Sequence, residues 1–160
     1  MKLDVSDALA NPGQEYSFSG SQAIADQEIG GDTVRLEDAA VEGVFLSDED
    51  GNISIRGKLS TIAHARCANC LEPAQARVEN GFDETFLRGG DPEDDEIFAY
   101  DGREVPLDKL VMSDAVMALP IRFLCREDCP GFEYRDPEAD RNEPGVQYPF
   151  AGLRQLLDNQ

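Results

Sequence analysis

Apolar and polar residues alternate along much of the first hundred residues, which is the pattern of half-buried β-strands. The alternation begins at Val34, runs to Phe45 and stops at an acidic turn over residues 48–51. It resumes over residues 53–63 and again over residues 74–86. Alternating runs separated by turns rich in Asp and Gly are typical of β-hairpins, so this part of the chain predicts an antiparallel sheet.

The spacing of apolar residues changes to three- and four-residue steps further along the chain. These steps predict one main helix, with Pro106 in its first turn and Pro120 after its end. The apolar positions of this helix are Leu107, Leu110, Val111, Ala115 and Ala118. A short strand is expected before it, over residues 97–100. The fold class is therefore α+β: mainly antiparallel hairpins, in a sheet that could close into a barrel, with one main helix.

Composition divides the chain into four segments. We expect residues 1–32 to form an N-terminal arm that could contain one strand, and residues 33–131 to form the α+β core. Residues 132–147 are rich in Pro, Gly and charge and predict an exposed connector. Residues 148–160 predict a short amphipathic helix. Its apolar side, which could dock on the sheet or bind a partner, includes Phe150, Leu153 and Leu157.

The chain is strongly acidic. Its 160 residues include 14 Lys and Arg against 33 Asp and Glu, for a net charge of −19. Such a surface does not neutralise phosphates by itself and is repelled by anionic lipid, so we expect a basic partner and no membrane contact. No apolar run reaches the roughly 20 residues of a membrane span, and the first residues lack the apolar core of a signal peptide. We therefore expect a cytoplasmic protein with reduced cysteines.

The four cysteines form two close pairs, Cys67 with Cys70 and Cys125 with Cys129. Two close pairs far apart in sequence are typical of a structural zinc site, because each pair supplies two thiolates to one tetrahedral ion. The spacing predicts a structural zinc ion bound in a zinc-knuckle-like site. Arg66 precedes the first pair, and Arg126 lies inside the second, so both could offset thiolate charge.

Two other interpretations of the cysteines stay open. They could be buried thiols without a ligand, or Cys67 and Cys70 could form a thiol oxidoreductase motif. Redox motifs usually begin a helix, whose dipole stabilises the thiolate, whereas this one follows a predicted strand and leads to Pro73. His64 lies three residues before Cys67 and is expected to face solvent.

The residues of catalytic sites are scarce. His64 is the single histidine, and the chain contains no Gly-rich phosphate loop. A zinc ion held by four cysteines has no open position for water or substrate. We therefore expect a protein that is not an enzyme.

Four sequence blocks together resemble the YceD family, also called DUF177. They are residues 66–73 around the first cysteine pair, residues 118–121, residues 124–131 around the second pair, and residues 149–157. The resemblance covers residues 34–157 and implies a role in the accumulation of large-subunit ribosomal RNA. Many family members carry further cysteines after the second pair. Here residues 132–135 are Phe-Glu-Tyr-Arg, so metal binding depends on the four cysteines together.

The leading hypothesis is a non-enzymatic ribosome-biogenesis factor that binds a basic ribosomal protein or a large-subunit pre-rRNA particle. Direct contact with RNA, the less favoured form, would use a local basic face of Arg56, Lys58, Arg66 and Arg126. The alternatives are the thiol oxidoreductase and an acidic adaptor, unrelated to the ribosome, that binds through its C-terminal apolar side. The sequence leaves the oligomeric state open.

Overall fold

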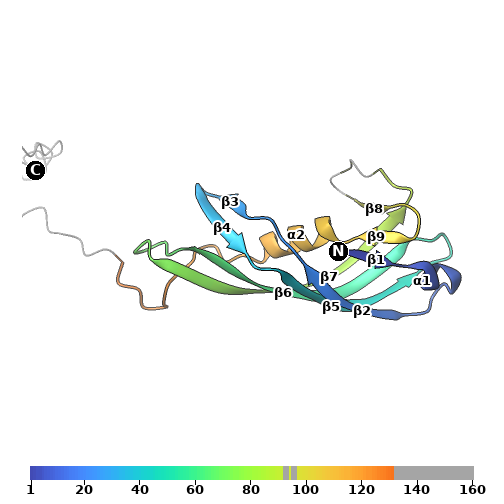
Figure 1. Cartoon of the computed structure of the whole chain (residues 1–160), viewed down its shortest axis with the longest axis horizontal. Helices are drawn as coiled ribbons and strands as arrows, with labels where there is room; N and C mark the ends of the chain where they lie inside the picture. Colours follow the sequence, from blue (N-terminus) through green and yellow to red (C-terminus); the bar gives the residue numbers. More distant parts are fainter. Residues whose placement is uncertain (92–93, 95–96, 132–160) are drawn as a thin grey trace, which may run out of the picture. The chain divides into compact units, whose positions relative to one another are not determined.

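The structure is a computed structural model that describes residues 1–91, 94 and 97–131. Figure 1 shows the strands and helices of these residues. In order they are β1 (Lys2–Asp4), α1 (Ser6–Ala10), β2 (Tyr16–Gln22), β3 (Gln27–Ile29), β4 (Asp32–Leu36), β5 (Ala39–Ser47), β6 (Ile53–Arg66), β7 (Pro73–Arg88), β8 (Phe98–Tyr100), β9 (Glu104–Pro106) and α2 (Asp108–Met117).

The long strand β6 is the centre of the main sheet. It pairs antiparallel with β5 and β4 and with β7, while β2 extends the sheet beyond β5 and β3 extends it beyond β4. These pairs confirm the predicted antiparallel sheet, and β8 adds to β7 as a parallel strand. Among the described strands no ladder joins β2 or β3 to β8, so the sheet is open and does not form a closed barrel.

The predicted acidic turn joins β5 to β6. The Asn52 N–H donates to Asp48 Oδ1 at 2.8 Å, and the Asp48 N–H donates to the Asn52 C=O at 3.0 Å. Gly51 has a φ of +84°, a conformation that a side chain would strain. The turn thus requires the Asp48 side chain as an acceptor and Gly at the positive φ. Because these requirements involve only neighbouring residues, the turn could be predicted from the sequence.

A β-bulge lies between β4 and β5. Leu36 pairs with Ala63 and Ala40 pairs with Ser60, so this side of the ladder holds one residue more than β6 does. The Glu37 N–H donates to the Ile62 C=O at 3.0 Å, and the hydroxyl of buried Thr61 donates to the Glu37 C=O at 2.7 Å. The Thr61 hydroxyl thus satisfies the backbone carbonyl at the bulge.

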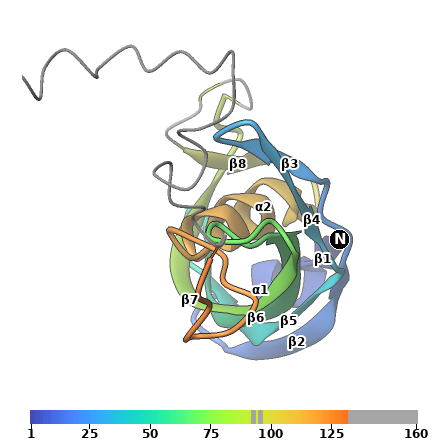
Figure 2. The same ribbon diagram turned by 90° about the vertical axis from the view of Figure 1, so that its left-hand side faces the viewer.

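Helix α2 packs against β6 and β7, inside the curve of the sheet (Figure 2). Its residues Leu110, Val111 and Ala115 are buried, as the three- and four-residue spacing predicted. The expectation for Pro106 is wrong: it ends β9 and pairs with Lys2 of β1, and the helix begins at Asp108. The residues buried between sheet and helix include Ile53, Ile55, Leu59, Val78, Phe82, Phe86, Leu107 and Leu110.

Residues 1–32 contain more structure than an arm with one strand. β1 pairs with β9, β2 pairs with β5, and β3 pairs with β4. Val5 and Ala8, around α1, are fully buried. Weak alternation in this segment hid its strands, since these edge strands bury few side chains.

In the part of the chain that the structure describes, no helix is long and apolar enough to cross a membrane. The predicted connector over residues 132–147 and the predicted helix over residues 148–160 lie outside the described residues.

Candidate metal centre

The first cysteine pair lies on the loop that joins β6 to β7. The Cys67 N–H donates to the Glu72 C=O at 2.8 Å, and the Leu71 N–H donates to the Cys67 C=O at 2.9 Å. These bonds close a tight hairpin in which Cys67 is fully buried and Cys70 is half-buried. Leu71 completes the loop with a φ of +64°, in the left-handed region that normally favours Gly. The motif follows a strand and enters another strand, as predicted, and it does not begin a helix.

The second pair lies on the irregular segment after α2, which is held against the first loop. The Ala68 N–H donates to the Phe123 C=O at 2.8 Å, and the Asn69 side-chain amide donates to the Cys129 C=O at 3.3 Å. Sequence reasoning missed both contacts. Their acceptors are backbone carbonyls, which leave no signal in the residue pattern.

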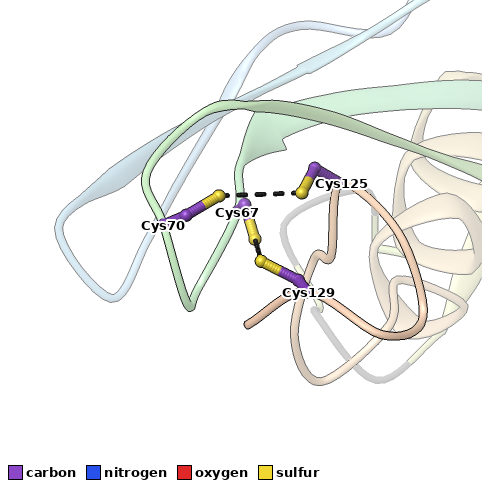
Figure 3. Close-up of side chains that lie close together, drawn as sticks. All are labelled: Cys67, Cys70, Cys125 and Cys129. Atoms are coloured by element: carbon purple, nitrogen blue, oxygen red, sulfur yellow. Dashed lines mark hydrogen bonds between the residues drawn. The ribbon is translucent and has the colours of Figure 1, made fainter. Parts of the chain in front are cut away.

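All four sulfur atoms meet between these two segments (Figure 3). The Sγ atoms of Cys67 and Cys129 are 3.7 Å apart, and those of Cys70 and Cys125 are 3.6 Å apart. All four sulfurs lie within 4.8 Å of one another. A tetrahedral zinc ion with Zn–S bonds of about 2.3 Å places its sulfurs about 3.8 Å apart. The four cysteines therefore have the spacing and the donor chemistry to bind a metal ion, and none of them is in a disulfide.

The thiols are electrostatically unequal. The Cys125 N–H, followed by the N–H groups of Cys70 and Asn69, lowers the pKa of Cys67 to about 6 against the opposing effect of burial. The neighbouring thiols of Cys129 and Cys70 raise the pKa of Cys125 to about 12. Negative charge on one sulfur thus opposes negative charge on the next.

The charged neighbours of the cluster are paired with other side chains. Arg66 pairs with Asp32, and Arg126 Nε lies 3.6 Å from Asp128 Oδ1. His64 Nε2 lies 2.7 Å from Glu37 Oε1, and the cluster itself consists of cysteines alone.

The other two basic residues singled out from the sequence lie together on the outer face of β6. Arg56 Nε is 3.1 Å from Asp83 Oδ2, and Lys58 Nζ is 2.9 Å from Glu42 Oε1. Both line a shallow hollow of about 660 Å³ on the sheet. Arg66 lies beside the cysteines, roughly 25 Å along the strand from Lys58 at about 3.3 Å per residue. Phe150, Leu153 and Leu157 lie outside the described residues.

The fold and the cluster define a class of protein: a small α+β protein in which a curved antiparallel sheet holds one helix and carries a four-cysteine candidate metal site at one hairpin end. The chain belongs to the YceD family. The family model described as large ribosomal RNA subunit accumulation protein YceD matches residues 55–157, a range that contains both cysteine pairs. The match confirms the family predicted from the sequence blocks.

The curated relatives extend the similarity toward the N-terminus. Uncharacterized proteins of Mycobacterium bovis and of two strains of Mycobacterium tuberculosis are each 22% identical to this chain over 155 residues. Each alignment covers 92% of this chain and 74% of the relative. No solved structure matches the chain.

Proposed function

We propose that this protein is a non-enzymatic factor that supports the accumulation of large-subunit ribosomal RNA by binding a basic ribosomal protein or a pre-ribosomal RNA–protein particle. The observation that carries this proposal is membership of the family described as large ribosomal RNA subunit accumulation protein.

Charge supports a basic protein, or a particle that exposes one, as the partner. A chain of net charge −19 attracts a basic protein and accelerates encounter with it, and this attraction weakens as salt rises. Naked RNA is a poorer partner. Arg56, Lys58, Arg66 and Arg126 each have an acidic side chain within ion-pair distance, which offsets their charge toward phosphate.

The proposed cofactor is one structural zinc ion held by Cys67, Cys70, Cys125 and Cys129. Four thiolates suit zinc, and a four-coordinate site leaves no position for a substrate. When bound, the ion supplies a cross-link between the β6–β7 loop and the segment after α2. This role is structural and needs no reaction at the site.

Affinity capture tests the function. The tagged full-length protein is recovered from its own host at low salt, and the bound RNA and proteins are identified. We expect large-subunit ribosomal RNA or ribosomal proteins to be enriched over a tag-only control, with a recovery that falls steeply between low and high salt. Recovery of neither at low salt would contradict the proposal.

Elemental analysis tests the metal. Protein purified without chelator should contain about one zinc per chain, and Cys67→Ser and Cys125→Ser should each lose it, because the ligands come from both segments. A variant of a neighbouring residue outside the cluster, Arg126→Ala, should retain it. Zinc that survives in Cys125→Ser would contradict a shared four-cysteine site.

Two assays separate the alternatives. A thiol oxidoreductase would reduce insulin with a thiol reductant present, whereas a structural site gives no turnover above a Cys67→Ser control. An adaptor that binds through its C-terminal apolar side would lose its partner when the chain is truncated after Gly145, while its thermal unfolding stays unchanged.

A further inference from the structure

Strand β7 leaves most of one edge open. Its other edge pairs with β6 over residues 73–86, from Phe86 opposite Ile53 to Pro73 opposite Arg66. On the open side, β8 pairs only with residues 86–88. Over residues 73–85, the described part of the chain provides no second ladder and no backbone hydrogen bond on that side.

Hydrogen bonds at the two ends of β7 show which residues face this edge. The Glu72 C=O accepts from Cys67 of the β6 side, and the Arg88 N–H donates to Asn52, also on the β6 side. Even-numbered residues therefore direct their backbone groups toward β6. Since these groups alternate along a strand, the odd-numbered residues direct theirs toward the open edge. They are Gln75, Arg77, Glu79, Gly81, Asp83 and Thr85.

The open edge is long and regular. It extends roughly 40 Å at 3.3 Å per residue, and its register with β6 contains no bulge. Protein edges of this kind are usually blunted by Lys, by internal Pro or by a bulge. Here Pro73 lies at the first residue only, and no Lys occurs in β7. The one inward-pointing charge, Glu84, is half-buried at the far end near Phe86.

The negative charge of the chain indicates which kind of segment would bind at the open edge of β7. The open part of β7 carries Glu79, Asp83 and Glu84 against Arg77. Because Glu79 pairs with Arg77 and Asp83 pairs with Arg56, the attraction for a basic segment comes mainly from the net charge of −19 of the whole chain. A second copy would bring an equal negative charge to the edge and be repelled. An extended basic segment is attracted to it.

We propose that the open edge of β7 is a strand-addition site that binds an extended, Lys- or Arg-rich segment of a protein partner. The partner's backbone extends the ladder at the odd-numbered residues, and its charge complements the acidic chain. This proposal takes the basic partner from the proposed function and adds where and how it binds.

Amide hydrogen exchange of the full chain tests the site. The probe is a short peptide of alternating Lys and Thr, and the controls are the same peptide N-methylated at alternate residues and a peptide of alternating Glu and Thr. We expect the Arg77, Glu79, Gly81 and Asp83 amides to exchange about tenfold more slowly with the Lys peptide and to be unchanged with either control. Unchanged exchange with the Lys peptide would overturn the proposal.

A pair of proline variants tests whether the peptide binds at the open edge of β7. Gly81→Pro removes an edge-facing N–H without removing a bond to β6, so the fold should survive and binding of the Lys peptide should fall about tenfold or more. The control is Ser19→Pro on β2. The Gly13 N–H donates to the Ser47 C=O, so the odd-numbered residues of β5 direct their backbone groups toward β2. These residues pair with even-numbered residues of β2, so the backbone groups of Ser19 point to the outer edge of β2. Ser19→Pro should bind normally, and loss there instead of in Gly81→Pro would overturn the proposal.

Three further outcomes are decisive. Thermal unfolding checks that each variant is folded. Analytical sedimentation measures the oligomeric state. If the wild type is a dimer and Gly81→Pro is a monomer, the edge binds a second copy of the chain and the proposal is overturned. If Gly81→Pro captures ribosomal proteins as the wild type does, the edge proposal fails and the proposed function stands. If the wild type captures none while the Lys peptide protects β7, the function fails and the edge site stands.

Discussion

Glycines in the middle of β5 and β6 make room for the backbone and the Phe side chains of the neighbouring strands. Phe18 pairs with Gly43, Gly43 with Gly57, and Gly57 with Phe82, in one row across four strands. A Cβ on Gly57 would lie 2.8 Å from Phe82 Cζ, and a Cβ on Gly43 would lie 2.7 Å from the Gly57 Cα. Phenylalanine rings and neighbouring backbone therefore take the space that a side chain would need.

Gly57→Ala should destabilise the protein by about 1–3 kcal/mol, because the added methyl group would clash with the backbone carbonyl oxygen of Glu42 and with the Phe82 ring. Chemical denaturation measures the change in the free energy of unfolding. The matched control is Gly81→Ala, where an added Cβ would meet, among the described residues, only the Gly57 oxygen at 3.7 Å. Equal losses in the two variants would contradict the explanation by packing.

Leu71→Gly should raise the free energy of unfolding of the metal-free protein by up to about 1 kcal/mol. Leu71 is half-exposed and has a φ of +64°, where a side chain costs roughly 1 kcal/mol and Gly does not. Chemical denaturation in the presence of a chelator measures this effect without the metal. A loss of 1 kcal/mol or more would show that the Leu71 side chain packs more than its exposure indicates.

Asp114 on α2 predicts a pH effect. Burial, followed by the charge of Glu84, raises the pKa of Asp114 above its ordinary value of 3.8. Its Oδ2 is buried and finds no hydrogen-bond partner among the described residues. The folded state then binds more protons than the unfolded state between 3.8 and the raised pKa, so this group lowers stability as pH rises through that window. Asp114→Asn should therefore raise the melting temperature above the window and leave it unchanged below it. A rise of the same size at every pH would exclude a titration effect.

Among the elements, α2 depends most on its surroundings. It has no side-chain cap at its N-terminus and spans ten residues, which is short for a helix stable on its own. Burial of its apolar side against β6 and β7 therefore stabilises it. The segment that carries Cys125 and Cys129 follows α2, so docking of this helix also positions half of the cysteine cluster.

Leu110→Ala should destabilise the protein by about 2–5 kcal/mol, because Leu110 is fully buried in α2 and its truncation leaves a cavity against the sheet. Chemical denaturation measures the loss. Met117→Ala on the same helix is the control: Met117 is 78% exposed, so its change should stay within about 0.5 kcal/mol. A loss under 1 kcal/mol for Leu110→Ala would contradict the observed packing.

At the scale of the whole molecule, the cysteine cluster joins parts of the chain that are distant in sequence. Cys67 and Cys70 close the β6–β7 hairpin, and Cys125 and Cys129 lie 55 to 62 residues further on. Two direct hydrogen bonds, from Ala68 and Asn69, connect the same two segments. A bound metal ion would add a much stronger link between them.

Removal of the proposed zinc with a chelator should lower the melting temperature by about 10 °C or more, because the binding free energy of a structural zinc ion contributes directly to folding. Scanning calorimetry measures the shift, and added zinc should reverse it. Cys67→Ser should show no further shift with chelator. A wild type whose melting temperature is indifferent to chelator would contradict a structural metal.

The sequence by itself determined the hairpins, the acidic turn, the main helix and the family, because alternation, turn residues and cysteine spacing are local signals. The cysteine spacing also predicted that the four cysteines form one site, and their sulfurs lie within 4.8 Å of one another. Only the tertiary structure decided that residues 1–32 pair into the sheets, that Pro106 ends a strand, and that one edge of β7 stays open. These features depend on backbone hydrogen bonds between distant segments, and such bonds use groups that every residue carries, so they leave no mark on the order of side chains.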